Sequence, residues 1–425
     1  MRICSITPHQ LLNNPRAVRE ADALAAAGHD VRVVAVRNSP EQSALDDSRA
    51  HGRAWRLQTI DIQRTPEGRV AWLRTGIRQK AAKALWRRLR RGERLAITAY
   101  CRTAAETTRL ILDEPPDLII AHTHPMLGVA HLAARRLDCR WGFDCEDLLS
   151  EEYGEGISDP VHQALVRYVE ATFMPRADYV TVASPEFSGW LAGHYGIRES
   201  VYIANMPSIA DAPEALRPGY PDSRRHLSLY WFSISLGPLR GVEDAIRALP
   251  LIEVPVTLHL RGRVLPGYDR ELRALIGSLN VSDRVVVHDL VAPEQAVRAA
   301  ADHDIGLVLT QPCCENHELA VPNKIYTYVM AGAAVGATAT RGHRSVLATM
   351  RDVGFEYQPG NHVELAERVT ALAREPGRLR ACRAEAFRLG QARVNWEVEQ
   401  RRLVDLVAGL APQPAGVSAW GPARA

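Results

Sequence analysis

The sequence NHELAVPNKIYTYVMAG (residues 316–332) joins a predicted strand to a predicted helix. The strand is indicated by an apolar run over residues 304–310, and Pro322 suits the first turn of the helix. Asn323 and Lys324 therefore fall where a strand ends and a helix begins. The first turn of a helix has free backbone N–H groups and a positive dipole, so this junction is suited to holding a phosphate or a sugar phosphate.

On both sides of this segment, predicted strands and helices alternate in two series. The first series occupies residues 1–210 and the second residues 226–394, and a cluster of prolines over residues 211–225 predicts a linker. Helical spacing predicts a last helix over residues 395–411, and the Ala-, Pro- and Gly-rich residues 412–425 predict a disordered tail. We therefore expect an α/β protein with two Rossmann-like, doubly wound parallel sheets that face a central cleft.

The composition is that of a globular protein without a strong overall charge. The chain has 425 residues, 46% of them hydrophobic, and 52 Lys and Arg against 49 Asp and Glu give a net charge of +3. This balance argues against nucleic acid as a partner. The sequence begins directly with a strand pattern and has no apolar run of about 18 residues, so we expect a cytoplasmic protein without a signal peptide or membrane span. The seven cysteines lack paired metal-type spacing, which predicts reduced thiols and no metal site.

Several segments, in order along the chain, resemble the GT-B glycosyltransferases of family 4. They are MRICSITPHQLLNNPRAVREADALAAAGHDVRVVAV (1–36), DLIIAHTHP (117–125), ADYVTVASPEF (177–187), GPLRGVEDAIRAL (237–249), ADHDIGLVL (301–309) and NKIYTYVMAGAAV (323–335). The resemblance extends over about residues 1–410. It implies a GT-B fold in which the last helix crosses back to the first domain.

The resemblance also implies an activity. Enzymes of this family bind a nucleotide-diphosphate sugar on the second domain and an acceptor on the first. They transfer the sugar with retention of configuration and without a metal or cofactor. Protein cations and backbone N–H groups must then neutralise the diphosphate leaving group.

Three basic residues are candidates for holding that diphosphate. Arg240 stands where the family has a phosphate-binding lysine, and its planar guanidinium can serve as well. A second family cation, five or six positions earlier, is replaced here by Ser235 or Ile234. Lys324 and Arg261 are the available substitutes. The alternatives are that Arg240 is a solvated residue before a helix and that Arg261 pairs with a carboxylate such as Asp269.

The acidic residues depart further from the family. Many relatives have two glutamates eight residues apart around this loop, for the sugar and the ribose, and the corresponding residues here are Leu319 and Thr327. Glu318 can replace the first after a small loop shift, whereas Thr327 offers a weaker hydroxyl contact. Asn316 and Asn323, at the two ends of the loop, complete the predicted donor-binding set.

The family's His-x-His-Pro pattern is matched by His122-Thr123-His124-Pro125, directly after a predicted strand. The resemblance places His124 near the reacting sugar, where it can bond a donor hydroxyl or carry the acceptor proton, and His122 beside the cleft. The alternative is a pair of strand-end histidines bonded to the backbone. A metal site is less favoured because no third ligand is near in sequence.

Two more clusters of the first domain are candidates for the cleft. Asn14 and Arg16 lie in the first strand-to-helix loop, which lacks the family's glycines, so their side chains would have to contact the ligand; a helix cap is the alternative. Asp144 and Glu146, with Asp147, follow another strand. One carboxylate can act as a base toward the acceptor, or the group can begin a helix with favourable charge.

A basic amphipathic helix is predicted near residues 72–94, with apolar residues every four positions and only one acid from Arg74 onward. It can lie on an anionic membrane, at its inner face, and bring a lipid-linked acceptor to the cleft. The alternative is a helix packed on the first domain with a solvated basic face. The absence of an aromatic platform argues against nucleic-acid binding.

The sequence thus predicts a glycosyltransferase that uses a nucleotide-sugar donor and a small-molecule, glycan or lipid-linked acceptor. Two alternatives remain open. The missing acidic pair is compatible with a catalytically weak sugar-nucleotide-binding or membrane-scaffold protein of the same fold, and a sugar-nucleotide epimerase would need no acceptor.

Overall fold

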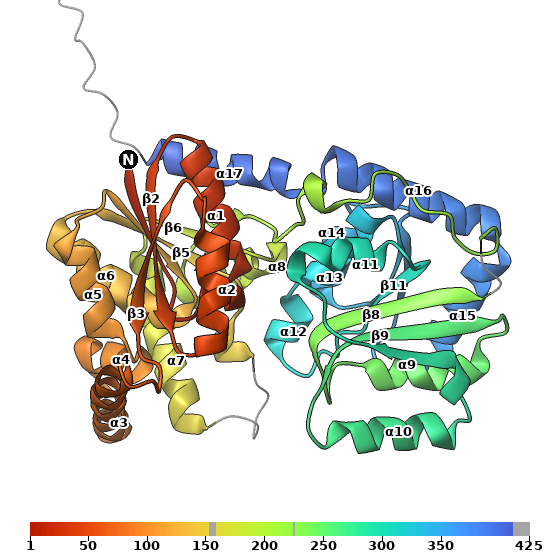
Figure 1. Ribbon diagram of the computed structural model, residues 1–425, viewed down its shortest axis with the longest axis horizontal. Helices are drawn as coiled ribbons and strands as arrows, with labels where there is room; N and C mark the ends of the chain where they lie inside the picture. Colours follow the sequence, from red (N-terminus) through yellow and green to blue (C-terminus); the bar gives the residue numbers. More distant parts are fainter. Residues whose placement is uncertain (153–158, 224–225, 411–425) are drawn as a thin grey trace, which may run out of the picture.

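The protein folds into two α/β domains that lie side by side (Figure 1). The structure is a computed structural model and describes residues 1–152, 159–223 and 226–410. Each domain is built on one parallel sheet with helices packed against it, so the predicted fold class is confirmed. The predicted disordered tail over residues 412–425 lies outside the described residues.

The first domain contains a seven-stranded parallel sheet in the order β3-β2-β1-β4-β5-β6-β7. Its strands are β1 (Arg2–Ile6), β2 (Asp30–Arg37), β3 (Arg56–Asp61), β4 (Leu118–His122), β5 (Arg140–Cys145), β6 (Tyr179–Val182) and β7 (Val201–Tyr202). Its helices are α1 (Pro15–Ala26), α2 (Pro40–Ala50), α3 (Arg69–Leu89), α4 (Glu93–Tyr100), α5 (Ala104–Asp113), α6 (Leu127–Leu137), α7 (Pro160–Phe173) and α8 (Pro185–Tyr195). The sequence pattern misses β3, an edge strand in which Ile60 alone is buried and which therefore lacks a continuous apolar run.

The second domain contains a six-stranded parallel sheet in the order β10-β9-β8-β11-β12-β13. Its strands are β8 (Leu227–Leu236), β9 (Val256–Val264), β10 (Val285–His288), β11 (Ile305–Val308), β12 (Ala334–Thr338) and β13 (Gly354–Tyr357). Its helices are α9 (Val242–Ala248), α10 (Tyr268–Ser278), α11 (Ala296–Ala300), α12 (Glu315–Leu319), α13 (Asn323–Ala331), α14 (Arg341–Leu347), α15 (His362–Arg374) and α16 (Pro376–Ala392), and α17 (Trp396–Gly409) follows them. The sequence does not predict α12, because five residues are too few to show helical periodicity.

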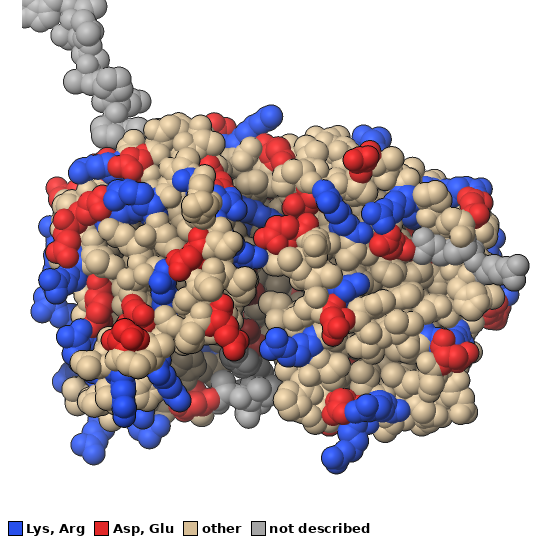
Figure 2. Space-filling model, in the orientation of Figure 1, with Lys and Arg blue, Asp and Glu red and all other residues tan. Residues whose placement is uncertain are grey.

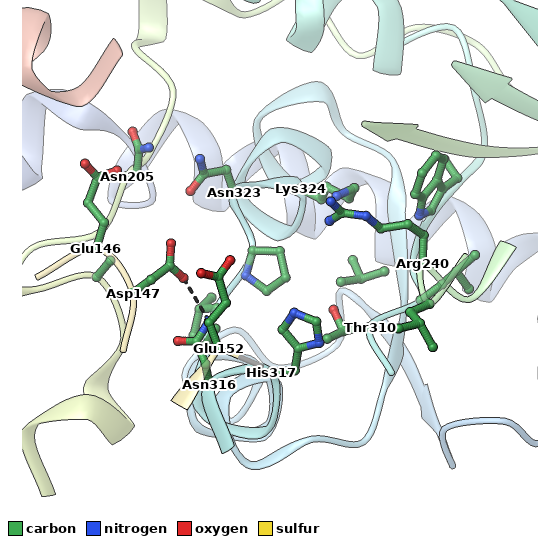
Figure 3. Close-up of a pocket in the computed structure, with 18 residues that line it drawn as sticks. Glu146, Asp147, Glu152, Asn205, Arg240, Thr310, Asn316, His317, Asn323 and Lys324 are labelled. Carbon is green, nitrogen blue, oxygen red and sulfur yellow. Dashed lines mark hydrogen bonds between the residues drawn. The ribbon is translucent and has the colours of Figure 1, made fainter. Parts of the chain in front are cut away.

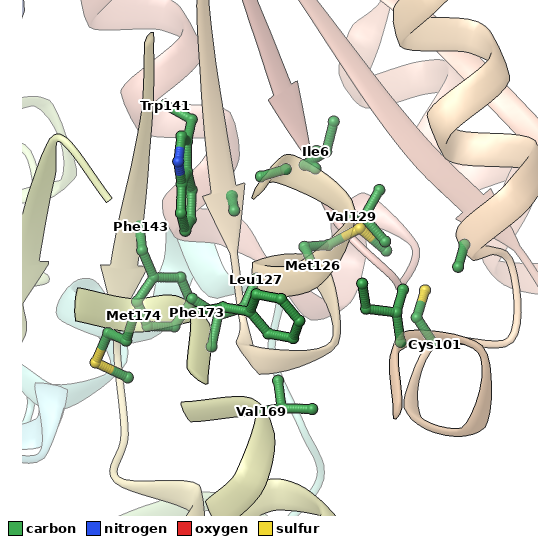
Figure 4. Packing of buried hydrophobic residues seen from close by; sticks show 14 of the residues in the cluster. Ile6, Cys101, Met126, Leu127, Val129, Trp141, Phe143, Val169, Phe173 and Met174 are labelled. Carbon is green, nitrogen blue, oxygen red and sulfur yellow. The ribbon is translucent and has the colours of Figure 1, made fainter. Parts of the chain in front are cut away.

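A cluster of large apolar side chains packs against the first sheet (Figure 4). Ile6, Met126, Leu127, Phe143 and Phe173 are all fully buried there. Burial of a side chain of this size contributes on the order of 1.5–3 kcal/mol. The packing fixes the carboxyl end of β5, where the predicted site carboxylates begin.

Helix α17 runs from the second domain back across the first (Figure 1). Leu403 and Val407 are fully buried in a cluster that includes Val18 of α1. Glu399 accepts a hydrogen bond of 2.7 Å from the backbone N–H of Ala204. The last helix therefore joins the two domains, as the resemblance implies.

The predicted basic helix is divided in two. Helix α3 ends at Leu89, because Arg90 is left-handed with φ of 50° and Gly92 has φ of 101°, and α4 follows. A single helix over residues 72–94 is therefore wrong at its C-terminal end. Within the described parts of the chain, no helix combines the length and the apolar character needed to cross a membrane.

Candidate functional site

A cavity of about 300 Å³ lies between the domains, at the carboxyl ends of both sheets (Figure 3), and the hollow between the two lobes is visible in Figure 2. It has the place predicted for the cleft. Five of the predicted site residues line it: Glu146, Arg240, Asn316, Asn323 and Lys324. The end of β5, the loop after β8 and the segment from α12 to α13 bring them together.

Lys324 lies in the first turn of α13 and lines the second-domain wall of the cavity (Figure 3). Its Nζ is 5.4 Å from the ring centre of Trp231 and 5.7 Å from that of Phe232, within the range of cation–π interaction. Burial, and next the charge of Arg240, lowers the pKa of Lys324 to about 8. The chain has three lysines and 49 arginines. At this position a lysine brings a charge that titrates near neutral pH, which an arginine does not.

The second-domain wall of the cavity carries positive charge from Arg240 and Lys324. Within the described chain, no carboxylate pairs with Lys324 or Arg240. Pro322 precedes α13 without a side-chain cap, so the first N–H groups of the helix have no side-chain acceptor. Two unpaired cations and a helix amino end are the arrangement that binds a phosphate or diphosphate.

The loop that carries Arg240 has a backbone that few residues tolerate. Leu239 has φ of 63° and Gly241 has φ of 73°. A Cβ atom on Gly241 would lie 2.0 Å from the carbonyl oxygen of Leu309, at the end of β11. Only glycine fits this close approach, and the strained loop is held against the neighbouring strand. The contact fixes the position from which Arg240 reaches the cavity.

Glu146 and Asp147 form the facing wall, from the first domain (Figure 3). Burial, and next the charge of Asp144, raises the pKa of Glu146. Burial also raises the pKa of Asp147, against the effect of a hydrogen bond from Asn316. With its pKa raised to about 8, Glu146 keeps its proton near neutral pH, and it can then donate a hydrogen bond without repelling an anion. The two walls therefore suit one ligand with a diphosphate at one end and hydroxyl groups at the other.

Asn316 links the two domains beside the cavity. Its Oδ1 accepts a hydrogen bond of 2.9 Å from the backbone N–H of Leu148, and its Nδ2 donates one of 3.2 Å to Asp147. On the same helix, Leu319 is 1% exposed within the apolar cluster of the first domain, and its carbonyl accepts a 2.5 Å bond from Ser184. The residue that replaces the family's first glutamate is therefore an apolar contact between the domains.

Three residues predicted for the cleft lie instead in a buried charged network of the first domain. Arg16 Nε is 2.7 Å from Asp144 Oδ2 and 3.1 Å from Glu20 Oε1, and His122 Nδ1 is 3.3 Å from Asp144 Oδ2. All four side chains are at most 2% exposed, and none of them lines the cavity. Asp144 is therefore the common partner of Arg16 and His122, and the assignment of these three residues to the cleft remains a prediction.

The network keeps Asp144 ionised. Burial raises the pKa of Asp144, but Arg16 and His122 outweigh it and hold the pKa below its usual range. Burial and the charge of Asp144 raise the pKa of Glu20. Glu20, His122 and Asp144 have ligand atoms within 4.8 Å of one another. Arg16 is already paired with both carboxylates, so this group does not favour a metal site.

His124 and Asn14 also have partners inside the first domain. His124 is 2% exposed, and its Nε2 lies 3.0 Å from Glu170 Oε1. Glu170 also accepts a 2.7 Å bond from the hydroxyl of Tyr195. Asn14 Oδ1 accepts a 3.0 Å bond from the backbone N–H of Ala17 and caps α1, so the helix-cap alternative is confirmed for this residue.

Arg261, Glu318 and Thr327 do not line the cavity. Arg261 donates to the hydroxyl of Tyr230 at 2.9 Å and to a backbone carbonyl at 2.6 Å, and does not pair with Asp269. Glu318 accepts a 3.0 Å bond from the first N–H of α14, and Thr327 bonds its own helix at 3.1 Å. Their assignment to the donor remains a prediction without a structural argument.

The cavity also contains residues that the sequence prediction does not name. They include Glu152, Asn205, Trp231, Thr310 and His317. Thr310 follows β11 directly, so its place after a strand was a usable signal, and His317 lies in α12, within residues 316–332. Asn205 follows β7 in the same way. Trp231 lies inside a strand, and nothing in the sequence marks it as facing a cavity.

Comparisons with known proteins agree with this fold. Residues 14–205 match the family described as glycosyl transferase 4-like domain, which covers most of the first domain. No curated protein sequence matches the chain.

Solved structures resemble the whole chain. HepE from Anabaena in complex with UDP has a TM-score of 0.66 at 17% identity, over 96% of this chain and 100% of that one. Sucrose-phosphate synthase from Thermosynechococcus elongatus has a TM-score of 0.72 at 16% identity, over 96% and 99%. WaaG, a glycosyltransferase of lipopolysaccharide biosynthesis, has a TM-score of 0.61 at 16% identity, over 96% and 99%. At these identities the likeness establishes the fold.

Proposed function

We propose that this chain is a glycosyltransferase that binds a nucleotide-diphosphate sugar in the cavity between its domains. Its two domains form the GT-B fold, and its first domain belongs to the glycosyl transferase 4-like family. One observation carries the proposal. Lys324 and Arg240, without carboxylate partners in the described chain, converge with the amino end of α13 on one wall of that cavity. HepE, a protein of the same fold, has been crystallised with UDP and with UDP-glucose.

The proposed chemistry follows from the two walls. When the sugar leaves the diphosphate, negative charge grows on the oxygen that is left behind, and Lys324, Arg240 and the first N–H groups of α13 stabilise it. The sugar then faces Glu146 and Asp147, whose carboxyl groups can bond its hydroxyls. We propose transfer with retention of configuration and without a metal or cofactor, and an acceptor that enters along the first domain.

The acceptor is proposed to be attached to a lipid, because α3 presents an apolar and basic surface. Trp86 anchors this helix to the domain and is 1% exposed. On the outer side Val70, Leu73, Ile77 and Leu85 are 44–75% exposed among the arginines and lysines. Figure 2 shows basic side chains projecting from the lower end of the first domain, where Figure 1 places α3. Such a face suits the headgroup region of an anionic membrane.

The membrane proposal can be tested at Ile77. Replacing this residue, 67% exposed, with Asp should weaken co-sedimentation with vesicles that contain anionic lipid by about tenfold or more, because one buried aliphatic side chain is worth about 1.5–3 kcal/mol. Val363→Asp, at a residue 47% exposed on the second domain, is the matched control and should sediment like the wild type. Equal binding of both variants and the wild type would remove α3 from the membrane surface.

Lys324→Ala should weaken the binding of a nucleoside diphosphate by about 1–3 kcal/mol, the loss expected for a hydrogen bond to a charged group. Isothermal titration calorimetry with UDP and the other common nucleoside diphosphates measures this loss. Lys83→Ala, on α3 and away from the cavity, serves as the control and should leave the affinity unchanged. An unchanged affinity in Lys324→Ala would exclude this residue from the site.

The affinity for a nucleoside diphosphate should fall as the pH rises through about 8. Lys324 has its pKa lowered to about 8, so it is charged below this pH and increasingly neutral above it. Ionisation of Glu146, whose pKa is raised, adds repulsion in the same direction. Lys324→Arg keeps its charge at every pH tested and should lose less affinity between pH 7 and pH 9. An equal loss in both proteins would show that another group titrates.

Turnover of a panel of radiolabelled nucleotide-sugar donors, with and without lipid extracts as acceptors, tests the function itself. Transfer of label to an acceptor supports the glycosyltransferase. Nucleotide binding with neither transfer nor hydrolysis would favour the catalytically weak binding protein. The replacement of the family's acidic pair is the reason for considering that alternative. Conversion of the sugar nucleotide without an acceptor would indicate an epimerase.

A further inference from the structure

Two adjacent cysteines and a histidine come together at the edge of the cavity. Cys313, Cys314 and His317 each offer a ligand atom, and these atoms all lie within 4.8 Å of one another. Cys313 Sγ is 3.2 Å from His317 Nδ1. Cys313 is exposed and the other two are partly exposed, so solvent reaches the group. The spacing of the cysteines in the sequence does not predict this group, because a single turn of the chain and the short helix α12 bring its residues together.

The chemistry of these ligands selects the kind of ion. Two thiolates and one imidazole form a soft set that favours zinc over magnesium or calcium. In a tetrahedral zinc site with Zn–S of about 2.3 Å and Zn–N of about 2.0–2.1 Å, neighbouring ligand atoms lie roughly 3.4–3.8 Å apart. The three atoms are thus within about 1 Å of a chelating arrangement before any ion binds.

The group differs from the other metal-type cluster in the described chain. In the cluster of Glu20, His122 and Asp144, the carboxylates are neutralised by Arg16. Among the described residues, no cation is paired with the two thiols. A divalent cation can therefore bind the thiols without displacing another cation, whereas it would have to displace a guanidinium from the first cluster.

We infer that Cys313, Cys314 and His317 bind one zinc ion at the edge of the nucleotide-sugar cavity. Binding releases the proton of each thiol, and the imidazole gives its Nδ1 lone pair in place of its present contacts with Cys313 and with the Gln311 carbonyl, 3.1 Å away. The fourth position is left to water. His317 also lines the cavity, so the ion fixes the orientation of one cavity side chain and joins the loop after β11 to α12. The site has a structural role and takes no part in the transfer step.

Cobalt binding to the full-length, reduced and chelator-treated protein tests the inference. Thiolate ligands give cobalt an intense near-ultraviolet charge-transfer band, which should appear up to one equivalent of Co²⁺ and disappear when Zn²⁺ is added. Cys313→Ser and Cys314→Ser should each weaken metal affinity by at least tenfold, and His317→Gln should do so while it keeps part of the thiolate band. Cys139→Ser, at a partly exposed cysteine of the first domain, is the matched control and should bind like the wild type.

Two results would overturn the site. One is a wild-type protein without a stoichiometric thiolate–cobalt band, and the other is an equal band in the Cys313→Ser, Cys314→Ser double variant. A shift in the melting temperature with Zn²⁺, present in the wild type and absent in the double variant, is a second readout that does not depend on the spectrum. Neither measurement uses sugar transfer, so the metal site and the proposed function can fail separately.

Discussion

Replacing Arg16 with Met is expected to lower the free energy of unfolding by about 3–5 kcal/mol, the cost of leaving a buried charge without its partner. Arg16 is fully buried and lies 2.7 Å from Asp144 and 3.1 Å from Glu20. Without the guanidinium, His122 is the one basic side chain of the described residues that remains beside Asp144, together with a hydrogen bond from the Thr181 hydroxyl. Methionine fills much of the volume of the arginine side chain, so the loss of stability reflects the missing charge more than lost packing.

Urea unfolding followed by fluorescence and circular dichroism measures this loss. Arg2→Met is the matched control, because Arg2 pairs with Asp117 at 2.8 Å on the same sheet but the two side chains are 58% and 42% exposed. Exposed pairs contribute about 0–1 kcal/mol. A loss for Arg16→Met no larger than for Arg2→Met would contradict the account of the buried network.

Leu319→Ala should cost about 2–5 kcal/mol, the range for a leucine truncated in a packed core. This side chain belongs to α12 of the second domain and is 1% exposed inside the apolar cluster of the first. The cavity left behind weakens the contact between the domains. Part of the loss should therefore appear as opening of the two lobes, which small-angle X-ray scattering detects as a larger radius of gyration.

The control for this substitution is Leu290→Ala, at a second-domain leucine that is 43% exposed. It should change stability by less than about 0.5 kcal/mol, as surface substitutions usually do. If Leu319→Ala is as stable as this control and equally compact in solution, α12 does not hold the domains together.

The sequence predicted the fold well because both sheets are parallel. Strands buried on both faces are continuous apolar runs, and the helices between them keep an apolar stripe, so the alternation is visible along the whole chain. Two of the misses have clear physical causes. β3 is an edge strand that is mostly accessible to solvent, and α12 is shorter than two helical turns.

The sequence predicted residues that line the cavity where a strand end and a helix start suffice to place a residue. Lys324 and Asn323 follow from such a junction, and both line the cavity. Asp144 does not, because it lies inside β5, where its partner is Arg16, 128 residues away in the sequence. Local pattern shows that a polar residue ends a strand, but only the packing of distant elements decides whether it meets a ligand or another charge.

The packing of α12 and α17 has a consequence for the order of folding during synthesis. Leu319 and Leu403 complete apolar clusters of the first domain, although they are made well after its last strand, β7. At about 5–20 residues per second, the roughly 200 residues from β7 to the end of α17 take about 10–40 s to synthesise. During this time the first domain has its sheet but exposes the surfaces that these two leucines cover, so it depends on the arrival of the last helix to close.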